Sequence, residues 1–194
     1  MTMSQFITLS LTLILAENFV LVQFMGLTPF LGASKRVDIA AGMGAAVVFV
    51  TVVSSAAVYG IDALILRPLG MEYLRIVVFL VIIASLVQIV ELALQRFAPS
   101  LYKELGIYLP LIAVNSAVLA VAIAVSDQRM DLAGAVTYGL LASAGFALAI
   151  VLFAGIRERL AFSDHPKCFE GFPIALVSAG LLAMAFMGFS GMRV

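Results

Sequence analysis

Long stretches without a charged residue are the strongest constraint that this sequence places on its fold. A helix needs roughly 20 predominantly apolar residues to cross the hydrocarbon core of a bilayer. Five charge-free stretches occur, at 39–61, 76–90, 105–126, 132–156 and 171–192. Most reach that length, and 76–90 reaches it when extended past Arg75 and Glu91. The stretch 1–34, with Glu17 as its only charged residue, supplies another span. The sequence therefore predicts six transmembrane helices.

The composition assigns these spans to a helical membrane protein. Hydrophobic residues make up 64% of the chain and charged residues 11%, whereas an average soluble domain has about 25% charged residues. The alternating pattern of an outer-membrane barrel does not occur, so the expected fold is an all-α integral membrane protein. Eleven basic and eleven acidic residues cancel, which leaves no electrostatic basis for binding nucleic acid.

Cysteine, histidine and motif content limit the chemistry that the chain can carry alone. It has one cysteine, Cys168, and one histidine, which excludes an internal disulfide or a metal site built from several of its own thiolates. No phosphate loop, catalytic triad or dinucleotide fingerprint occurs. We therefore expect a chain that is non-catalytic on its own and binds neither flavin nor NAD.

The distribution of lysine and arginine predicts the orientation of the helices. By the positive-inside rule, the side richer in basic residues faces the cytoplasm. This places both termini on the periplasmic or outer side of the cytoplasmic (inner) membrane. No basic residue occurs in 1–6, so we expect no cleavable signal peptide. The loops after helices one, three and five hold seven basic residues, Lys35, Arg36, Arg96, Lys103, Arg157, Arg159 and Lys167, and the opposite side holds four, Arg67, Arg75, Arg129 and Arg193.

Two of the six expected helices contain residues that interrupt helical structure. Proline removes a backbone donor, and a bilayer tolerates such breaks only where the freed groups are buried in protein or line a cavity. One broken helix opens each half of the chain, 1–98 and 99–194, which indicates a 3+3 inverted repeat within one transmembrane domain, 1–194, with both breaks near the membrane centre. Ordinary kinks would also explain the residues, which are Asn18, Gly26 and Pro29 in helix one and Pro110, Asn115 and Ser116 in helix four.

Two groups of charged and polar residues are candidates for function. Glu17 lies within a membrane span beside Asn18, so both could belong to a proton or sodium path; alternatively, Glu17 pairs with an arginine of a partner subunit or borders a water-filled vestibule. The Arg-Glu-Arg sequence 157–159 follows the fifth helix. It either anchors that end of the helix or docks soluble partner subunits.

Four segments of the sequence resemble a known family nearly from end to end. They read NFVLVQFMGLTPFLGASK at 18–35, LPLIAVNSAVL at 109–119, VLFAGIRERL at 151–160 and AFMGFSG at 185–191. In order and spacing they closely resemble the A subunits of Rnf complexes. They resemble more distantly the E subunits of the sodium-pumping NADH:quinone oxidoreductases.

The resemblance implies a small membrane subunit of a multi-subunit complex that moves electrons between ferredoxin and NAD and couples them to Na⁺ or H⁺ translocation. It implies a homologous E-type partner subunit of opposite topology, together with other subunits that carry flavin and iron-sulfur clusters. In this family each member of the A and E pair supplies two cysteines, one from each broken helix, to a shared [2Fe-2S] cluster.

This sequence departs from the family at both cluster positions. The family motif Gly-Leu-Cys-Pro-Phe reads Gly26-Leu-Thr-Pro-Phe, and Asn-Cys-Ala-Val-Leu reads Asn115-Ser-Ala-Val-Leu, so Thr28 and Ser116 stand where cysteines are expected. An alcohol is a much poorer iron ligand than a thiolate. Three explanations are open. The complex has no cluster here, or partner thiolates hold one and Thr28 and Ser116 only line its pocket. Alternatively, the two residues are engineered substitutions, or one of the two hydroxyls binds iron as an alkoxide.

Two other functions remain open on sequence grounds. The chain could be the E-type subunit of a quinone-reducing relative, which has the same architecture. It could also be a stand-alone permease for small solutes, because broken helices and inverted repeats are equally typical of transporters.

Overall fold

The computed structural model of the protein describes residues 3–97, 99, 102, 103, 106, 108–164 and 166–189. Within this part of the chain all regular structure is helical and no strand occurs. Four helices are long and apolar enough to cross a membrane, and two shorter apolar helices accompany them. The four are Val37–Leu66, Glu72–Phe97, Pro110–Asp127 and Leu132–Leu160, and the shorter ones are Phe6–Ala16 and Phe172–Met187. The expectation of an all-α, multi-pass membrane protein is confirmed.

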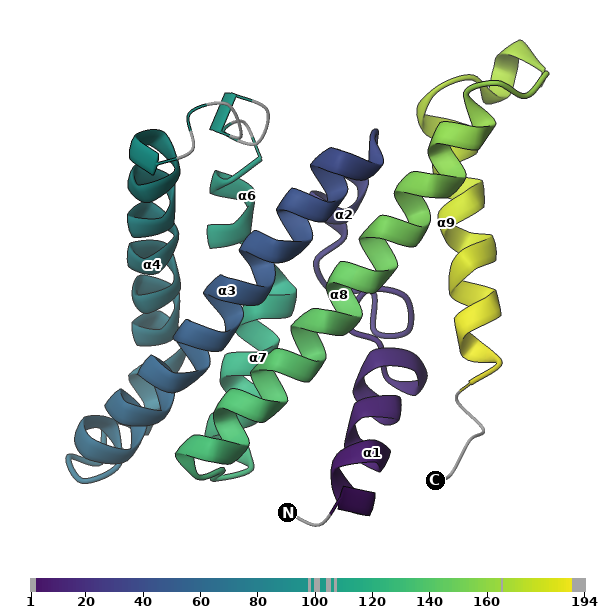
Figure 1. Ribbon diagram of the computed structural model, residues 1–194. Helices are drawn as coiled ribbons and strands as arrows, with labels where there is room; N and C mark the ends of the chain where they lie inside the picture. The colour runs from purple at the N-terminus through teal and green to yellow at the C-terminus, as the bar shows by residue number, and fades with distance from the viewer. Residues whose placement is uncertain are drawn as a thin grey trace.

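The bounds of the long helices follow the charge-free stretches closely (Figure 1). Leu105, Met192 and Arg193, on which some of the predictions above rest, lie outside the described residues. In chain order the elements are α1 (Met3–Leu11), the π-helical turn η1 (Thr12–Ala16), α2 (Leu27–Gly32), α3 (Val37–Ile61), the π-helical turn η2 (Asp62–Leu66), η3 (Glu72–Leu74), α4 (Arg75–Phe97), α6 (Pro110–Ala113), α7 (Ser116–Asp127), α8 (Leu132–Leu160), η4 (Lys167–Phe169) and α9 (Phe172–Met187).

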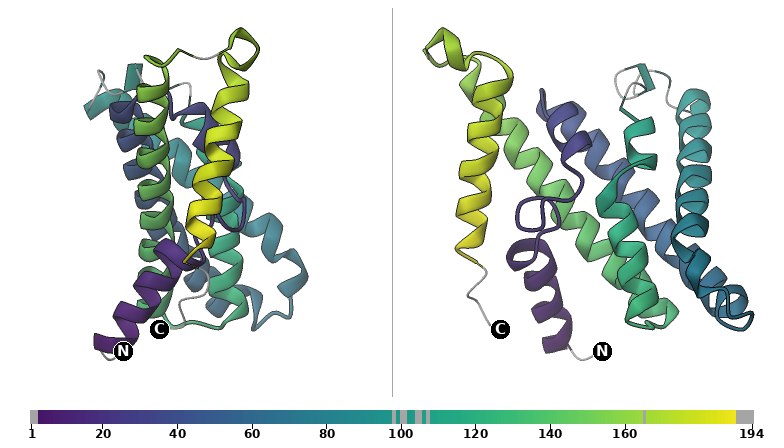
Figure 2. Two further views of the ribbon diagram at one scale, coloured as in Figure 1. Left: turned by 90° about the vertical axis from the view of Figure 1, so that its right-hand side faces the viewer. Right: turned by 180° about the vertical axis from the view of Figure 1, so that it is seen from behind.

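The centre of the molecule is the contact between the two longest helices, α3 and α8, with α7 packed against both. Helix α4 flanks α6 and α7, whereas α9 lies on the other side against α8 and η1 (Figures 1 and 2). Buried side chains of α3, such as Met43 and Val47, share one apolar core with Phe146 and Ile150 of α8. The bundle therefore has a compact middle and two flanking helices.

Both expected interruptions are present. Helical structure stops at Ala16 and resumes at Leu27, and it stops again at Ala113 and resumes at Ser116. The first break is a long irregular loop, and the second is a two-residue step. The loop is the reason that the first apolar segment supplies no continuous membrane-length helix.

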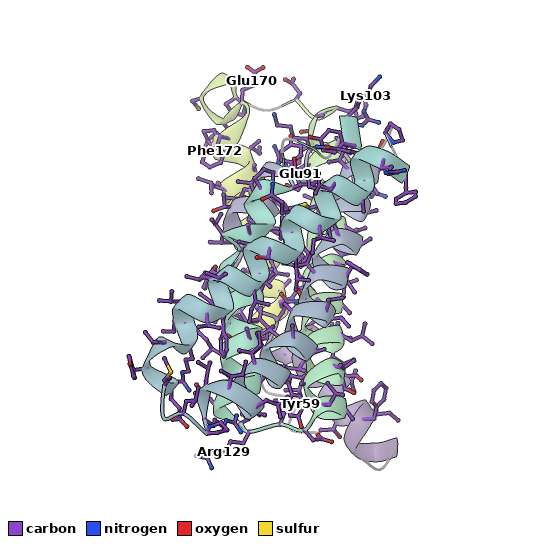
Figure 3. The ribbon with its side chains drawn as sticks, turned by 90° about the vertical axis from the view of Figure 1, so that its left-hand side faces the viewer. Tyr59, Glu91, Lys103, Arg129, Glu170 and Phe172 are labelled. Carbon is purple, nitrogen blue, oxygen red and sulfur yellow. The ribbon has the colours of Figure 1, made fainter. Side chains whose placement is uncertain are left out.

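The last helix is also shorter than expected, because α9 covers 16 residues of the stretch 171–192. Its start is set by Gly171, whose φ of 83° ends the preceding turn, and by a proline in the first turn. Helix α1 begins and α9 ends at the end of the bundle that holds the α7–α8 turn (Figure 1). Lys103 and Arg129, which the sequence predicts on opposite sides of the membrane, lie at opposite ends of the bundle (Figure 3).

A buried ion pair joins the end of α3 to the end of α7. The Asp62 side chain is 3% exposed, and its Oδ2 lies 2.5 Å from Arg67 Nη2. Ser126 Oγ donates to the same carboxylate oxygen at 2.9 Å, and Arg67 Nη2 donates to the Ser126 carbonyl at 3.0 Å. From the sequence Arg67 is only a loop charge and Asp62 has no predicted role, because the burial of Asp62 depends on a helix 64 positions away.

A candidate functional site where two interrupted helices meet

The two breaks lie against each other and are joined by a hydrogen bond. The Gly26 N–H, at the start of α2, donates to Ser116 Oγ, at the start of α7, at 2.8 Å. Gly26 has a φ of 75°, and a Cβ atom there would lie 2.7 Å from Asn115 Oδ1. Only glycine fits this backbone and this contact. The amino ends of two half-helices, 90 residues apart in sequence, therefore form one junction.

Asn115 starts the second half-helix. Its Oδ1 accepts a hydrogen bond from the Ala117 N–H at 3.0 Å, which caps α7. Its Nδ2 is buried and, within the described part of the chain, has no hydrogen-bond partner. Pro29 is buried in the first turn of α2, where the missing N–H disturbs no helical hydrogen bond. The junction thus contains one buried amide donor that no acceptor of the described residues satisfies.

Thr28 and Ser116, the two positions of interest from the sequence, both lie at the surface beside this junction. Thr28 also lines an open cavity of about 660 Å³, together with Gly32, Tyr108 and Arg157 among others. Both positions are therefore exposed close to where the two half-helices begin.

Asn18 organises the first break. Its Nδ2 donates to the carbonyls of Ile14 and Gly145, each at 2.9 Å, and its Oδ1 accepts from the N–H groups of Val20 and Leu21 at 3.0 and 3.1 Å. The side chain is fully buried. Gly145 of α8 admits it, because an added Cβ would lie 3.1 Å from Asn18 Nδ2. Asn18 thus fixes the loop to α8; its part in an ion path stays a prediction. Sequence reasoning missed Gly145, because no local signal marks it.

Glu17 precedes this buried asparagine but points away from the core. Its side chain is exposed, and within the described residues its carboxylate makes no hydrogen bond or ion pair. The neighbouring backbone is ordered by the Glu17 N–H, which donates to the Thr12 carbonyl at 2.7 Å. An uncompensated carboxylate is therefore held beside the break, available to an ion or to a partner.

The Arg-Glu-Arg sequence anchors one half of the chain to the other. Arg157 Nη1 donates to the Leu31 carbonyl and to Ser34 Oγ, each at 2.9 Å, at the end of α2. Glu158 Oε1 accepts from the Val37 N–H at 2.8 Å, which caps α3. Arg159 is exposed. Two of the three residues therefore act as helix-end anchors, and only Arg159 is free for docking.

The residues at the junction do not fit an iron-sulfur cluster. The two positions where the resemblance implies cysteines, Thr28 and Ser116, present alcohols, and Ser116 Oγ already accepts a hydrogen bond from the Gly26 N–H. Cys168 is exposed in η4, on the α8–α9 connection. Among the described residues no group of three or more His, Cys, Asp and Glu side chains is arranged to hold a metal ion. The chemistry of these donors favours hydrogen bonding, not iron ligation.

Comparison with known proteins gives matches over nearly the whole chain. A family model described as "Rnf-Nqr subunit, membrane protein" matches residues 6–193. A curated relative from Acetobacterium woodii, named as the A subunit of a Na(+)-translocating ferredoxin:NAD(+) oxidoreductase complex, is 51% identical over 187 residues, which are 96% of this chain and 97% of the relative. The A subunit of the ion-translocating oxidoreductase complex of Pasteurella multocida is 48% identical over 98% of this chain and 99% of its own length.

Replacing Asn18 with leucine tests its role at the first break. Leucine has a similar size but leaves the Val20 and Leu21 N–H groups without their acceptor. Since each buried unsatisfied group costs about 1–3 kcal/mol, we expect Asn18→Leu to lower stability by at least about 2 kcal/mol. The measurement is the thermal unfolding midpoint of the detergent-purified protein.

The matched control is Gln23→Ala, because Gln23 is exposed and makes one long hydrogen bond, 3.3 Å, to the Glu17 carbonyl. Its midpoint should stay close to that of the unaltered protein. Equal midpoints for Asn18→Leu and Gln23→Ala would contradict the assignment.

Proposed function

This chain belongs to the Rnf-Nqr family of membrane subunits, and on that premise we propose that it is the A-type membrane subunit of an Rnf-type complex, which couples electron transfer between ferredoxin and NAD to ion translocation. The carrying observation is the identity of about half of all residues, over nearly the full length, to relatives named as A subunits. The Acetobacterium relative is named as Na⁺-translocating and the Pasteurella relative as ion-translocating. Both Na⁺ and H⁺ therefore remain candidate coupling ions.

We propose that the chain is a 3+3 inverted repeat of six spans. The packing supports this, because equivalent helices of the two halves pair: α3 packs on α8, and the two breaks meet at Gly26 and Ser116. The third span, α4, packs on the fourth, and the sixth, α9, packs on the first at η1. These reciprocal contacts are those of a pseudo-two-fold axis between the halves.

Two arginines make equivalent contacts between the two halves of the chain. Arg67, just past η2, donates to the Ser126 carbonyl near the end of α7 at 3.0 Å. Arg157, near the end of α8, donates to the Leu31 carbonyl near the end of α2 at 2.9 Å. In each half the second span thus ends with an arginine that binds the carboxyl end of the other half's broken helix, where a cation is favoured by the helix dipole.

We infer that a homologous E-type subunit of opposite topology covers the junction. Two features support a protein partner: the exposed positions Thr28 and Ser116, and the exposed Glu17 carboxylate. Polar groups at membrane depth need partners, because lipid supplies none. Flavin and iron-sulfur clusters would be carried by other subunits, in the cytoplasmic membrane, with both termini of this chain on the outer side.

We further propose that this chain supplies no ligand to a shared [2Fe-2S] cluster. The support is the pair of alcohols and the Gly26–Ser116 hydrogen bond, which occupies one of them. Any thiolate ligands at the junction would then come from the E-type partner. Electron transfer in such a complex would then run through other subunits, or through a cluster that partner thiolates hold.

Copurification with other subunits tests the proposed function. We expect this chain, tagged at one terminus, to copurify with a homologous membrane protein and with flavin-carrying and iron-sulfur subunits that oxidise ferredoxin with NAD. Copurifying quinone-reducing subunits would identify the chain as the E-type relative instead. A monodisperse chain that transports a solute without partners would overturn the assignment in favour of a permease.

Restoring both thiols tests the cluster proposal. We expect the complex with the unaltered chain to show no reduced [2Fe-2S] signal from this site by low-temperature electron paramagnetic resonance. The double variant Thr28→Cys/Ser116→Cys should gain such a signal, with two further irons per complex. Each single variant is the matched control. A stoichiometric signal from the unaltered complex that disappears on Ser116→Ala would refute the proposal.

Glu17→Gln tests the exposed carboxylate at the break. If Glu17 lies on the ion path, the variant should retain electron transfer in detergent but lose most ion uptake into proteoliposomes, because the amide cannot carry the charge. Asp164→Asn, an exposed carboxylate in the α8–α9 connection, is the control and should transport normally. Normal ion uptake by Glu17→Gln would remove the residue from the path.

A further inference from the structure

The two arginine anchors differ in how their charges are compensated. Arg67 has a carboxylate of its own, because Asp62 Oδ2 lies 2.5 Å from its Nη2. Arg157 makes both of its hydrogen bonds through Nη1, to the Leu31 carbonyl and the Ser34 hydroxyl. Within the described residues Arg157 forms no ion pair. The charge of Arg67 is therefore neutralised by Asp62, whereas the charge of Arg157 has no such carboxylate partner among the described residues.

Arg157 borders two neighbouring cavities that share Lys35 and Gly171. The larger, about 660 Å³, is lined by both cations and by Tyr108, and none of its lining residues is acidic. The smaller, about 360 Å³, also includes Glu170. Lys35 is exposed and, in the part of the chain that the structure describes, has no ion-pair partner. The two cavities together are therefore lined by two cations, Lys35 and Arg157, and by one carboxylate, Glu170.

The orientation of Arg157 is fixed before any ligand binds. Its guanidinium carbon lies 5.7 Å from the centre of the Phe153 ring, and Phe153 stacks on Phe30 at 4.6 Å between ring centres. The ring and the two Nη1 hydrogen bonds hold the planar group, which leaves its other N–H groups for an anion. A preorganised arginine loses less freedom on binding, and its planar fork matches phosphate oxygens.

The walls of the cavities combine this charge with apolar surface. Leu31 and Phe172 line the larger cavity, and Ile174 and Ala175 line the smaller one. Phe172 is 61% exposed, and Figure 3 places it below Glu170 at the same end of the bundle as Lys103. Arg157 lies three residues before the end of the membrane-length helix α8. At about 1.5 Å per residue, the 29 residues of α8 are long enough to cross the bilayer together with its headgroup regions, so its last turn lies at the level of the lipid headgroups.

We propose that this cleft between α2, α8 and α9 binds an anionic phospholipid, whose phosphate sits between Arg157 and Lys35 and whose acyl chain follows Phe172 and Ile174. The lipid supplies from outside the negative charge that Asp62 supplies to Arg67 at the other end. Basic pockets between transmembrane helices recognise acidic headgroups in this way. A free phosphate would satisfy the charge but would leave the apolar wall uncovered. The proposal does not depend on whether the junction carries a cluster.

Lipid retention by the purified complex tests the site. The complex is delipidated in detergent, titrated with phosphatidylglycerol or with phosphatidylcholine, and analysed by native mass spectrometry of this chain once it has been ejected from the complex. We expect phosphatidylglycerol to bind this chain and phosphatidylcholine to bind much more weakly. Lys35→Gln should weaken phosphatidylglycerol binding about fivefold, the effect of one basic residue near a charged headgroup. Lys35 makes no internal ion pair among the described residues, so this variant leaves the Arg157 anchor intact.

Arg159→Gln is the matched control. It removes one positive charge from the same end of α8, but Arg159 is exposed and lines neither cavity. Its phosphatidylglycerol affinity should equal that of the unaltered complex. Equal losses in Lys35→Gln and Arg159→Gln would show a diffuse charge effect and overturn the proposal, as would equal retention of both lipids. Displacement of phosphatidylglycerol by millimolar inorganic phosphate would identify a free-anion site and overturn the lipid assignment.

Discussion

Backbone groups that leave a helix inside a membrane protein must find partners within the protein, and this requirement organises the structure. The first break frees the backbone around residues 17–26, where the Asn18 side chain satisfies the N–H groups of Val20 and Leu21 and also binds the carbonyls of Ile14 and Gly145. The second break frees the start of α7, which Asn115 caps. The Gly26–Ser116 hydrogen bond then closes one break against the other. The first half of the chain therefore depends on Ser116 of the second half to satisfy a backbone group at its break.

The same requirement acts at the outer ends of the half-helices. The carboxyl end of a helix presents carbonyls without helical partners, and a cation there satisfies both the hydrogen bond and the dipole. Arg67 does this for α7 and Arg157 does it for α2. The reciprocal arrangement ties the end of each broken helix to the second span of the other half. The two anchors differ in their surroundings, because Arg67 is paired with the buried Asp62 whereas Arg157 borders an open cavity.

Sequence patterns located the continuous spans and both breaks, because charge-free length and the placement of asparagine, glycine and proline are local properties. The charge-free stretch 132–156 lies within α8, and the irregular loop begins at the predicted Glu17 and Asn18. Side-chain partners could not be predicted in this way. Asn18 was a candidate for an ion path because its backbone contacts, one of them 127 positions away, leave no local signal. The choice between an anchoring and a docking role for Arg157 stays open on sequence grounds for the same reason, because its hydrogen-bond acceptors lie 123 and 126 positions earlier.

The hydroxyl of Ser116 accepts a backbone hydrogen bond at a position where the resemblance implies a cysteine. The resemblance to the A subunits of Rnf complexes implies a cysteine at this position, and its sulfur would lie beside the Gly26 N–H. An oxygen accepts an N–H hydrogen bond at 2.8 Å, as Ser116 does here, whereas a thiol is a weak acceptor. Serine thus satisfies the Gly26 N–H without metal, so the junction of the two half-helices can close through hydrogen bonds alone. The contact between the two breaks therefore rests on a hydrogen bond between groups of this chain and needs no metal ligand.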